Sequence, residues 1–288
     1  MSLTSYIVDK VFAKGNDKRD AGLTAPENII RYDDILYGND HKWNILDVYR
    51  PKEADTKLPV IVSVHGGGWV YGDKERYQYY CMDLASRGFA VINFTYRLAP
   101  KHRFPAQLED VCLAFEWLKN SYERYAFDLN DVFATGDSAG AHLLTLYCDL
   151  LINADYASRF SFRIPDLLPE AIALNCGVFN TNIDKGIIKM LVKDLISHKK
   201  DLELIDPLRY MTSDFPEAYV MTAIEDTVKD DSTLLLNRLN ELKVRNIYKL
   251  YDNERHDLGH VFHLNISDPD AILCNDEECS FFLTHVDE

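Results

Sequence analysis

Continuous apolar runs alternate along this chain with segments of helical periodicity. Runs such as 58–64 and 171–175 are typical of strands buried on both faces. Between residues 106 and 120 the apolar side chains recur three or four positions apart, which indicates an amphipathic helix. Asp231 or Ser232 is expected to cap a later helix. These criteria predict strands at residues 58–64, 89–94, 132–136, 171–175, 218–223 and 246–251, and helices at residues 106–120, 140–151, 231–244 and from 268 onward.

Strands that alternate with helices predict an α/β domain, with a mostly parallel central sheet and helices on both faces. Residues 31–50 alternate in polarity around Gly38-Asn39-Asp40, which predicts a hairpin. Residues 1–30 and 181–215 do not fit the alternation. We expect these two segments to pack together as a small cap over the site, so that residues 1–288 form one catalytic domain.

A strand-to-helix junction carries the sequence Gly136-Asp137-Ser138-Ala139-Gly140. This G-x-S-x-G pattern is that of a nucleophile elbow, a turn so tight that the serine backbone is strained and its neighbours must be small. The pattern is short and also occurs in glycine-rich surface turns. Its weight comes from a second motif, His65-Gly66-Gly67-Gly68-Trp69, which follows the strand at 58–64. Glycines at a strand end allow successive N–H groups to point at one oxyanion.

Together with Tyr96-Arg97-Leu98-Ala99-Pro100 and Phe104-Pro105-Ala106, these two motifs resemble the hormone-sensitive-lipase-like branch of the α/β-hydrolase esterases. The resemblance covers roughly residues 58–265 and implies an α/β-hydrolase fold. It also implies an oxyanion hole formed by the N–H groups of Gly67, Gly68 and Ala139, with His65 bracing the loop. Lys101-His102-Arg103 departs from the family pattern, as a change at the surface.

The same resemblance implies a catalytic triad in the chain order Ser, Asp, His. The strand at 218–223 is followed by Glu225 and Asp226, and Asp226 occupies the family's acid position, with Glu225 as the rival. Gly259-His260-Val261-Phe262 matches the family's G-H-x-F pattern, so that His260 is the expected base. His256 is the second candidate.

Three histidines within eight residues, His256, His260 and His263, also raise the alternative of a zinc site. No accompanying glutamate or cysteine ligand pattern supports that reading, and no metal is expected. His142 lies one helical turn after Ser138 and is expected to be a satisfied helix histidine.

The residue roles imply a serine carboxylesterase that uses no cofactor. His260 would take the proton of Ser138 as its oxygen attacks an ester carbonyl, and water would later release the acid. The family implies short acyl chains, from acetyl to about butyryl. Trp69, Tyr71 and Phe179 are candidates to line the substrate pocket, although core packing explains each of them equally well.

Three other functions remain open at this point. A non-catalytic, ligand-binding homologue would keep the fold and lose the chemistry. An acyltransferase would pass the acyl group to an alcohol instead of water, and an amidase would use the same triad on an amide. Product analysis with esters, amides and added alcohol distinguishes them.

Composition limits the partners and the location. The net charge of −15 opposes binding to nucleic acid or to anionic membrane surfaces, so a small-molecule ester is the expected partner. Residues 1–30 show no signal-peptide pattern, and no apolar run reaches about eighteen residues. The six cysteines form no C-x-x-C pair, which favours a reduced, cytoplasmic protein. A homodimer formed through the strand at 246–251 is compatible with the family.

Overall fold

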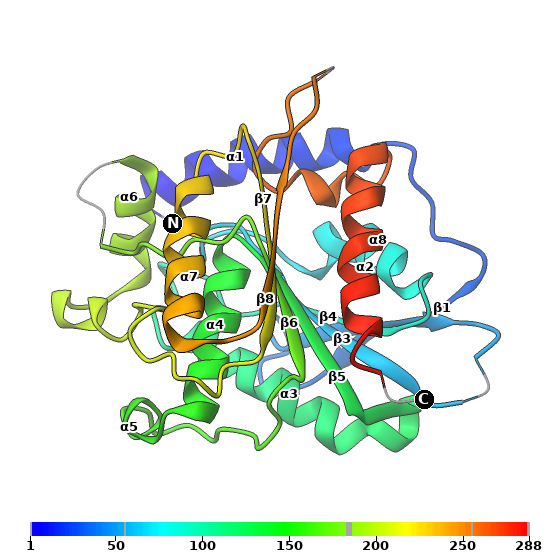
Figure 1. Cartoon of the computed structure of the whole chain (residues 1–288), viewed down its shortest axis with the longest axis horizontal. Coiled ribbons are helices and arrows are strands. Elements are labelled where there is room, and N and C mark those ends of the chain that lie inside the picture. Colours follow the sequence, from blue (N-terminus) through cyan, green and yellow to red (C-terminus); the bar gives the residue numbers. More distant parts are fainter. Residues whose placement is uncertain (1, 55, 183–185, 255, 287–288) are drawn as a thin grey trace.

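An eight-stranded sheet forms the centre of the computed structural model, which describes residues 2–54, 56–182, 186–254 and 256–286 (Figure 1). The strands lie in the order β1-β2-β4-β3-β5-β6-β7-β8. β2 pairs antiparallel with both of its neighbours, and the other pairings are parallel. The strands are β1 (Ile29–Leu36), β2 (Ile45–Pro51), β3 (Leu58–Val64), β4 (Ala90–Phe94), β5 (Phe127–Asp137), β6 (Ala171–Asn175), β7 (Glu217–Ala223) and β8 (Asn246–Tyr251).

Helices cover both faces of this sheet, as Figure 1 shows. One face carries α2 (Lys74–Ala85) and α8 (Pro269–Leu283). The opposite face carries α3 (Ala106–Tyr125), α4 (Ala139–Ile152) and α7 (Lys229–Leu242), and the short α5 (Ala154–Ala157) follows α4. The α/β-hydrolase fold, with a mostly parallel sheet between two helix layers, is therefore confirmed.

Buried strand residues alternate between two apolar cores. In β3, Val60, Val62 and Val64 belong to the core beneath α3, α4 and α7, whereas Ile61 belongs to the core beneath α2 and α8. Because successive side chains of a strand point to opposite faces, a strand covered on both sides must be apolar throughout. This explains the continuous apolar runs from which the strands were predicted.

The helix α2 was not predicted. Its buried face is made mainly of Tyr77, Tyr80, Cys81 and Met82, and it also includes Lys74. Tyrosines and a lysine hide the apolar stripe by which an amphipathic helix is found in a sequence. Asp73 caps α2 by accepting a hydrogen bond from the N–H of Arg76.

The prediction that Asp231 or Ser232 caps α7 is wrong. The helix begins two residues earlier, and Val228 occupies the N-cap position. Asp231 lies in the first turn, where its carboxylate accepts the N–H groups of Phe179 (2.8 Å) and Asn180 (2.9 Å). This carboxylate therefore fixes the loop after β6 instead of capping its own helix.

The two segments outside the α/β alternation form α1 (Leu3–Arg19), α6 (Gly186–Leu195) and the 3₁₀ helix η1 (Lys199–Leu202), which we call the cap. α1 and α6 contact each other, and α1 crosses the end of the sheet from which the loops after β7 and β8 extend (Figure 1). Phe12 of α1 packs edge-on against Tyr71, whose hydroxyl accepts a hydrogen bond from Asn16. Within the described residues, no helix combines the length and apolar character needed to cross a membrane.

Candidate active site

Ser138 lies at the junction of the central strand β5 and helix α4. Its backbone angles, φ 51° and ψ −115°, lie in a region that residues with a β-carbon rarely occupy. Gly140 permits this turn, because a β-carbon there would lie 1.9 Å from the carbonyl oxygen of Val64. A β-carbon on Gly136 would likewise lie 2.7 Å from the backbone of Gly140. The motif is therefore a sharp turn that presents Ser138 at the end of the sheet.

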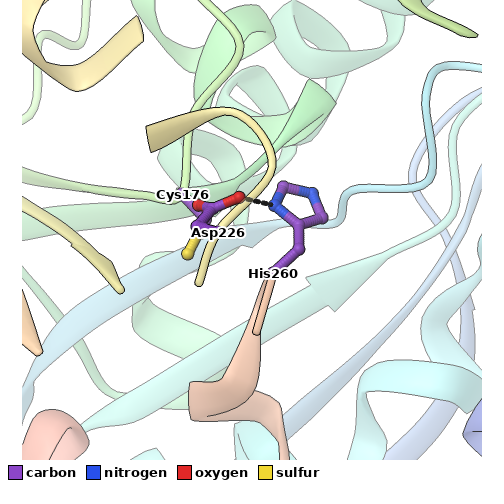
Figure 2. Close-up of side chains that lie close together, drawn as sticks. All are labelled: Cys176, Asp226 and His260. Atoms are coloured by element: carbon purple, nitrogen blue, oxygen red, sulfur yellow. Dashed lines mark hydrogen bonds and ion pairs between the residues drawn. The ribbon is translucent and has the colours of Figure 1, made fainter. Parts of the chain in front are cut away.

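A chain of hydrogen bonds joins Ser138, His260 and Asp226. His260 Nε2 lies 3.0 Å from Ser138 Oγ, and His260 Nδ1 lies 2.8 Å from Asp226 Oδ1. Figure 2 shows Asp226 and His260 facing each other, with Cys176 beside them. The three linked residues come from the loops after β5, β7 and β8, which emerge from the same edge because these strands are parallel.

The Asp226 side chain is buried and hydrogen-bonded at both oxygens. Oδ1 also accepts the N–H of Val228 (3.0 Å), and Oδ2 accepts the hydroxyl of Thr222 (2.8 Å). Burial by itself raises the pKa of the Asp226 carboxyl, but the hydrogen bond and charge of His260, with these two donors, outweigh it and lower the pKa below 3.8. The carboxylate is therefore ionised and oriented to hold Nδ1–H of His260.

The rival residues lie elsewhere. Glu225 is exposed, whereas Asp226 beside it is buried. His256 is directed at Asp268, with its Nε2 2.9 Å from Oδ2 of that residue. His263 is buried against the ring of Tyr80, and neither of its ring nitrogens has a hydrogen-bond partner among the described residues. Burial lowers the pKa of His263 to about 3. The three histidines of the loop thus diverge and do not form a common zinc site.

The glycine-rich loop after β3 adopts a backbone that requires glycine. Gly67 and Gly68 have φ values of 104° and 60°, and a β-carbon on Gly67 would lie 2.2 Å from the carbonyl oxygen of Tyr71. Within the part of the chain that the structure describes, no acceptor is found for the N–H groups of Gly67, Gly68 or Ala139. These donors are available for a developing negative charge.

His65 supports this loop from below. Its ring is buried, stacks on Tyr96 at 4.0 Å, and donates from Nδ1 to the carbonyl of Gly66 (2.8 Å). Burial lowers the pKa of His65 to about 4, so the imidazole is neutral. The expectation that His65 braces the loop agrees with this geometry.

A second support was missed in the sequence. The Tyr77 hydroxyl accepts the N–H of Gly66 (2.9 Å) and donates to Oδ2 of Asp137 (2.9 Å), so it joins the glycine-rich loop to the elbow. Burial raises the pKa of Asp137 to about 6, against the lowering effect of the Tyr77 hydrogen bond. The place of Asp137 within G-x-S-x-G was a signal that could have marked this aspartate as a site residue. Tyr77 carried no such signal, because it lies in helix α2, which was not predicted.

The three candidate pocket residues have different environments. Trp69 is fully buried, and its Nε1 donates to Nδ1 of His142 (3.2 Å), whose Nε2 donates to the carbonyl of Ile205 (2.8 Å). His142 is therefore a satisfied helix histidine, as predicted. Phe179 is also buried in the core, whereas Tyr71 lines a cavity of about 490 Å³ that Ser138 does not line. A role in the substrate pocket stays a prediction for these aromatic residues.

Comparison with known proteins shows which families this chain is similar to. The family model BD-FAE matches residues 46–158. Esterase LipC of Mycobacterium tuberculosis is 38% identical over 39% of this chain and 28% of its own length. Arylacetamide deacetylase of Bos taurus is 36% identical over 52% of this chain and 37% of its own length. The chain thus spans well under half of these two curated relatives.

Among solved structures, esterase B of Lactobacillus rhamnosis, inhibited by a C4-C4 tributyrin phosphonate, superposes with a TM-score of 0.91. It is 25% identical, and the match covers 98% of this chain and 95% of that one. The likeness therefore extends through the cap as well as the sheet. These similarities in sequence and structure support the resemblance of this chain to the hormone-sensitive-lipase-like branch of the α/β-hydrolase esterases.

Proposed function

We propose that this protein is a serine carboxylesterase that hydrolyses short-chain acyl esters through an acyl-enzyme. The observation that carries the proposal is the continuous hydrogen-bond chain from Asp226 through His260 to Ser138, at a strained strand-to-helix turn. Geometry of this kind gives a serine a general base and gives that base a fixed orientation. Ser138 is then the nucleophile, His260 the base and Asp226 the orienting acid.

The reaction begins when the Ser138 oxygen attacks the ester carbonyl and its proton passes to Nε2 of His260. Asp226 stabilises the imidazolium that forms, because its carboxylate accepts Nδ1–H. His260 then protonates the leaving alcohol, which leaves the acyl group on Ser138. In the second half, His260 removes a proton from water, and the resulting hydroxide releases the carboxylic acid.

The negative charge of the tetrahedral intermediate would be stabilised by the N–H groups of Gly67, Gly68 and Ala139. All three have no acceptor within the described part of the chain, so their hydrogen bonds are available to the substrate. Removing one such donor typically raises the barrier by about 3–4 kcal/mol. The left-handed φ angles of Gly67 and Gly68 fix these donors before substrate arrives.

Small acyl groups are favoured by the relatives. The solved esterase B carries a C4-C4 tributyrin phosphonate, and arylacetamide deacetylase is named for the removal of an acetyl group. We propose acetyl to butyryl esters for this chain, with α1 and α6 shaping the entrance for the alcohol. The deacetylase also makes amide hydrolysis the second candidate activity, which uses the same three residues.

Hydrolysis of p-nitrophenyl acetate, butyrate, octanoate and palmitate tests the proposal. We expect rapid turnover of the two short esters by the wild type, and its loss in Ser138→Ala and in His260→Ala. His256→Ala is the matched control and should keep its activity, because His256 pairs with Asp268 away from Ser138. Inactivity of the folded wild type toward all four esters and toward p-nitroacetanilide would contradict the proposal.

A further inference from the structure

Cys176 follows β6 directly and occupies an unusual backbone conformation. Its φ of 47° lies in the left-handed region, which favours glycine. The residue is fully buried, and its N–H donates to the carbonyl of Met221 in β7 (2.8 Å). Because a side chain in this backbone conformation costs free energy, the contacts that it makes are the place to look for its function.

The backbone on either side of Cys176 contacts the nucleophile. The carbonyl of Asn175 accepts the N–H of Ser138 at 3.0 Å, and the N–H of Val178 donates to the carbonyl of Ser138 at 3.2 Å. The segment 175–178 therefore holds the elbow at two points.

The thiol of Cys176 lies close to the other two loops of the site. It is near the carboxylate of Asp226 and near the backbone N–H of Val261, the residue after His260. Sγ, a carboxylate oxygen of Asp226 and a ring nitrogen of His260 all lie within 4.8 Å of one another (Figure 2). Burial raises the pKa of Cys176 well above its usual range, so that the thiol keeps its proton.

We propose that Cys176 is a positioning residue whose thiol joins the loop of Asp226 to the loop of His260 and fixes the orientation of their hydrogen bond. The inference rests on the proposed function of these residues. A protonated thiol in this place is able to donate to the carboxylate of Asp226 in one loop and to accept the N–H of Val261 in the other. Through Asn175, Cys176 and Val178, this short segment then lies beside every member of the triad.

The variants Cys176→Ser, Cys176→Ala and Cys176→Gly separate this role from packing. Serine keeps a donor and an acceptor, alanine removes both, and glycine removes both while relieving the left-handed backbone. Cys148→Ala is the matched control, since Cys148 is an equally buried free cysteine on α4 that the proposed mechanism does not use.

We expect kcat on p-nitrophenyl butyrate to fall about three- to tenfold in the alanine and glycine variants, with KM unchanged, which is the effect of one lost hydrogen bond. The serine variant should stay within about twofold of the wild type. The glycine variant should be at least as stable to heat as the alanine variant, so that activity and stability separate. Wild-type kcat in both the alanine and glycine variants, or losses of kcat that follow Tm across all four variants, would overturn the proposal.

A second measurement does not depend on catalysis. The low-field proton NMR resonance of His260 Nδ1–H reports its hydrogen bond to Asp226 directly. We expect faster exchange of this proton with water in the alanine and glycine variants, and unchanged exchange in the serine and Cys148→Ala proteins. Equal exchange in all of them would overturn the positioning role, even if the wild type hydrolysed none of the esters and the proposed function had failed by itself.

Discussion

The C-terminal end of the parallel strands, which carries Ser138 and which we call the sheet edge, is held together in a different way from the cap above it. At the sheet edge, backbone atoms approach so closely that only glycine fits, and buried polar groups are hydrogen-bonded to one another. The cap depends on apolar contacts and on a few side-chain hydrogen bonds, such as that of Asn16 with the Tyr71 hydroxyl and that of Arg103 with the backbone of α6. Ile187 and Met190 of α6 are also exposed.

This difference predicts how each region responds to change. A close-packed backbone has no means of relaxing, so a small substitution there has a large effect. A helix held by a few exposed contacts tolerates substitution and opens locally at low cost in free energy. We therefore expect substitutions at the sheet edge to affect folding and catalysis, and substitutions in the cap to affect the entry of substrate.

The largest effect is expected from Gly140→Ala. The new β-carbon would lie 1.9 Å from the carbonyl oxygen of Val64, a backbone atom of the central sheet that cannot move aside. We expect the free energy of unfolding to fall by at least about 3 kcal/mol. Gly15→Ala in α1 is the matched control, because a β-carbon there meets no atom within 4 Å. It should stabilise by about 0.5–1 kcal/mol, through helix propensity. Equal destabilisation in urea titrations of both variants would remove the contrast between the regions.

The next largest effect concerns the acid. Asp226→Asn should lower kcat on short esters about 10³- to 10⁴-fold, because an amide cannot stabilise the imidazolium and favours the wrong tautomer of His260. Glu225→Gln, one residue away and exposed, is the control and should retain wild-type activity. Steady-state kinetics on p-nitrophenyl butyrate measures both. A larger loss in Glu225→Gln would reverse the assignment of the acid.

The same contrast explains what the sequence could predict. The elbow and the glycine-rich loop are short motifs in which each glycine has a steric reason, so their form follows from local sequence. The strands of the sheet were found because burial on both faces leaves continuous apolar runs. The hydrogen bonds of Tyr77, and the position of Cys176 beside Asp226 and His260, bring together residues distant in the chain, and no local pattern marks such neighbours. For the cap, the sequence indicated that 1–30 and 181–215 lie outside the alternation and were expected to pack together, but it did not indicate which side chains make the contacts.

A pH-dependent effect is expected from Asp137→Asn. Burial raises the pKa of Asp137 in the folded protein to about 6, above the 3.8 of an exposed carboxyl. The folded state therefore binds this proton more tightly, so the wild type gains stability from Asp137 below about pH 4 and loses it as the pH rises through 6. Asparagine does not titrate. Between pH 4 and 7.5, stability should shift in favour of the variant by as much as about 3 kcal/mol. A difference in urea midpoints that stays constant with pH would show that Asp137 is not buried as a charge.

The smallest effect is expected at the cap. Arg103 donates from Nη1 to the carbonyls of Lys193 (3.1 Å) and Ile196, at the end of α6. Because this side chain is exposed, Arg103→Ala should cost at most about 1 kcal/mol of global stability. Limited proteolysis should nevertheless cut residues 186–202 faster, since α6 loses two of the bonds that fix its end. Arg163→Ala removes an exposed ion pair with Glu116 outside the cap and should leave the cleavage rate unchanged. If both variants are cleaved at the wild-type rate, the two Arg103 bonds do not hold α6, and its apolar face, through residues such as Leu191, packs the cap as firmly as the sheet edge beneath it.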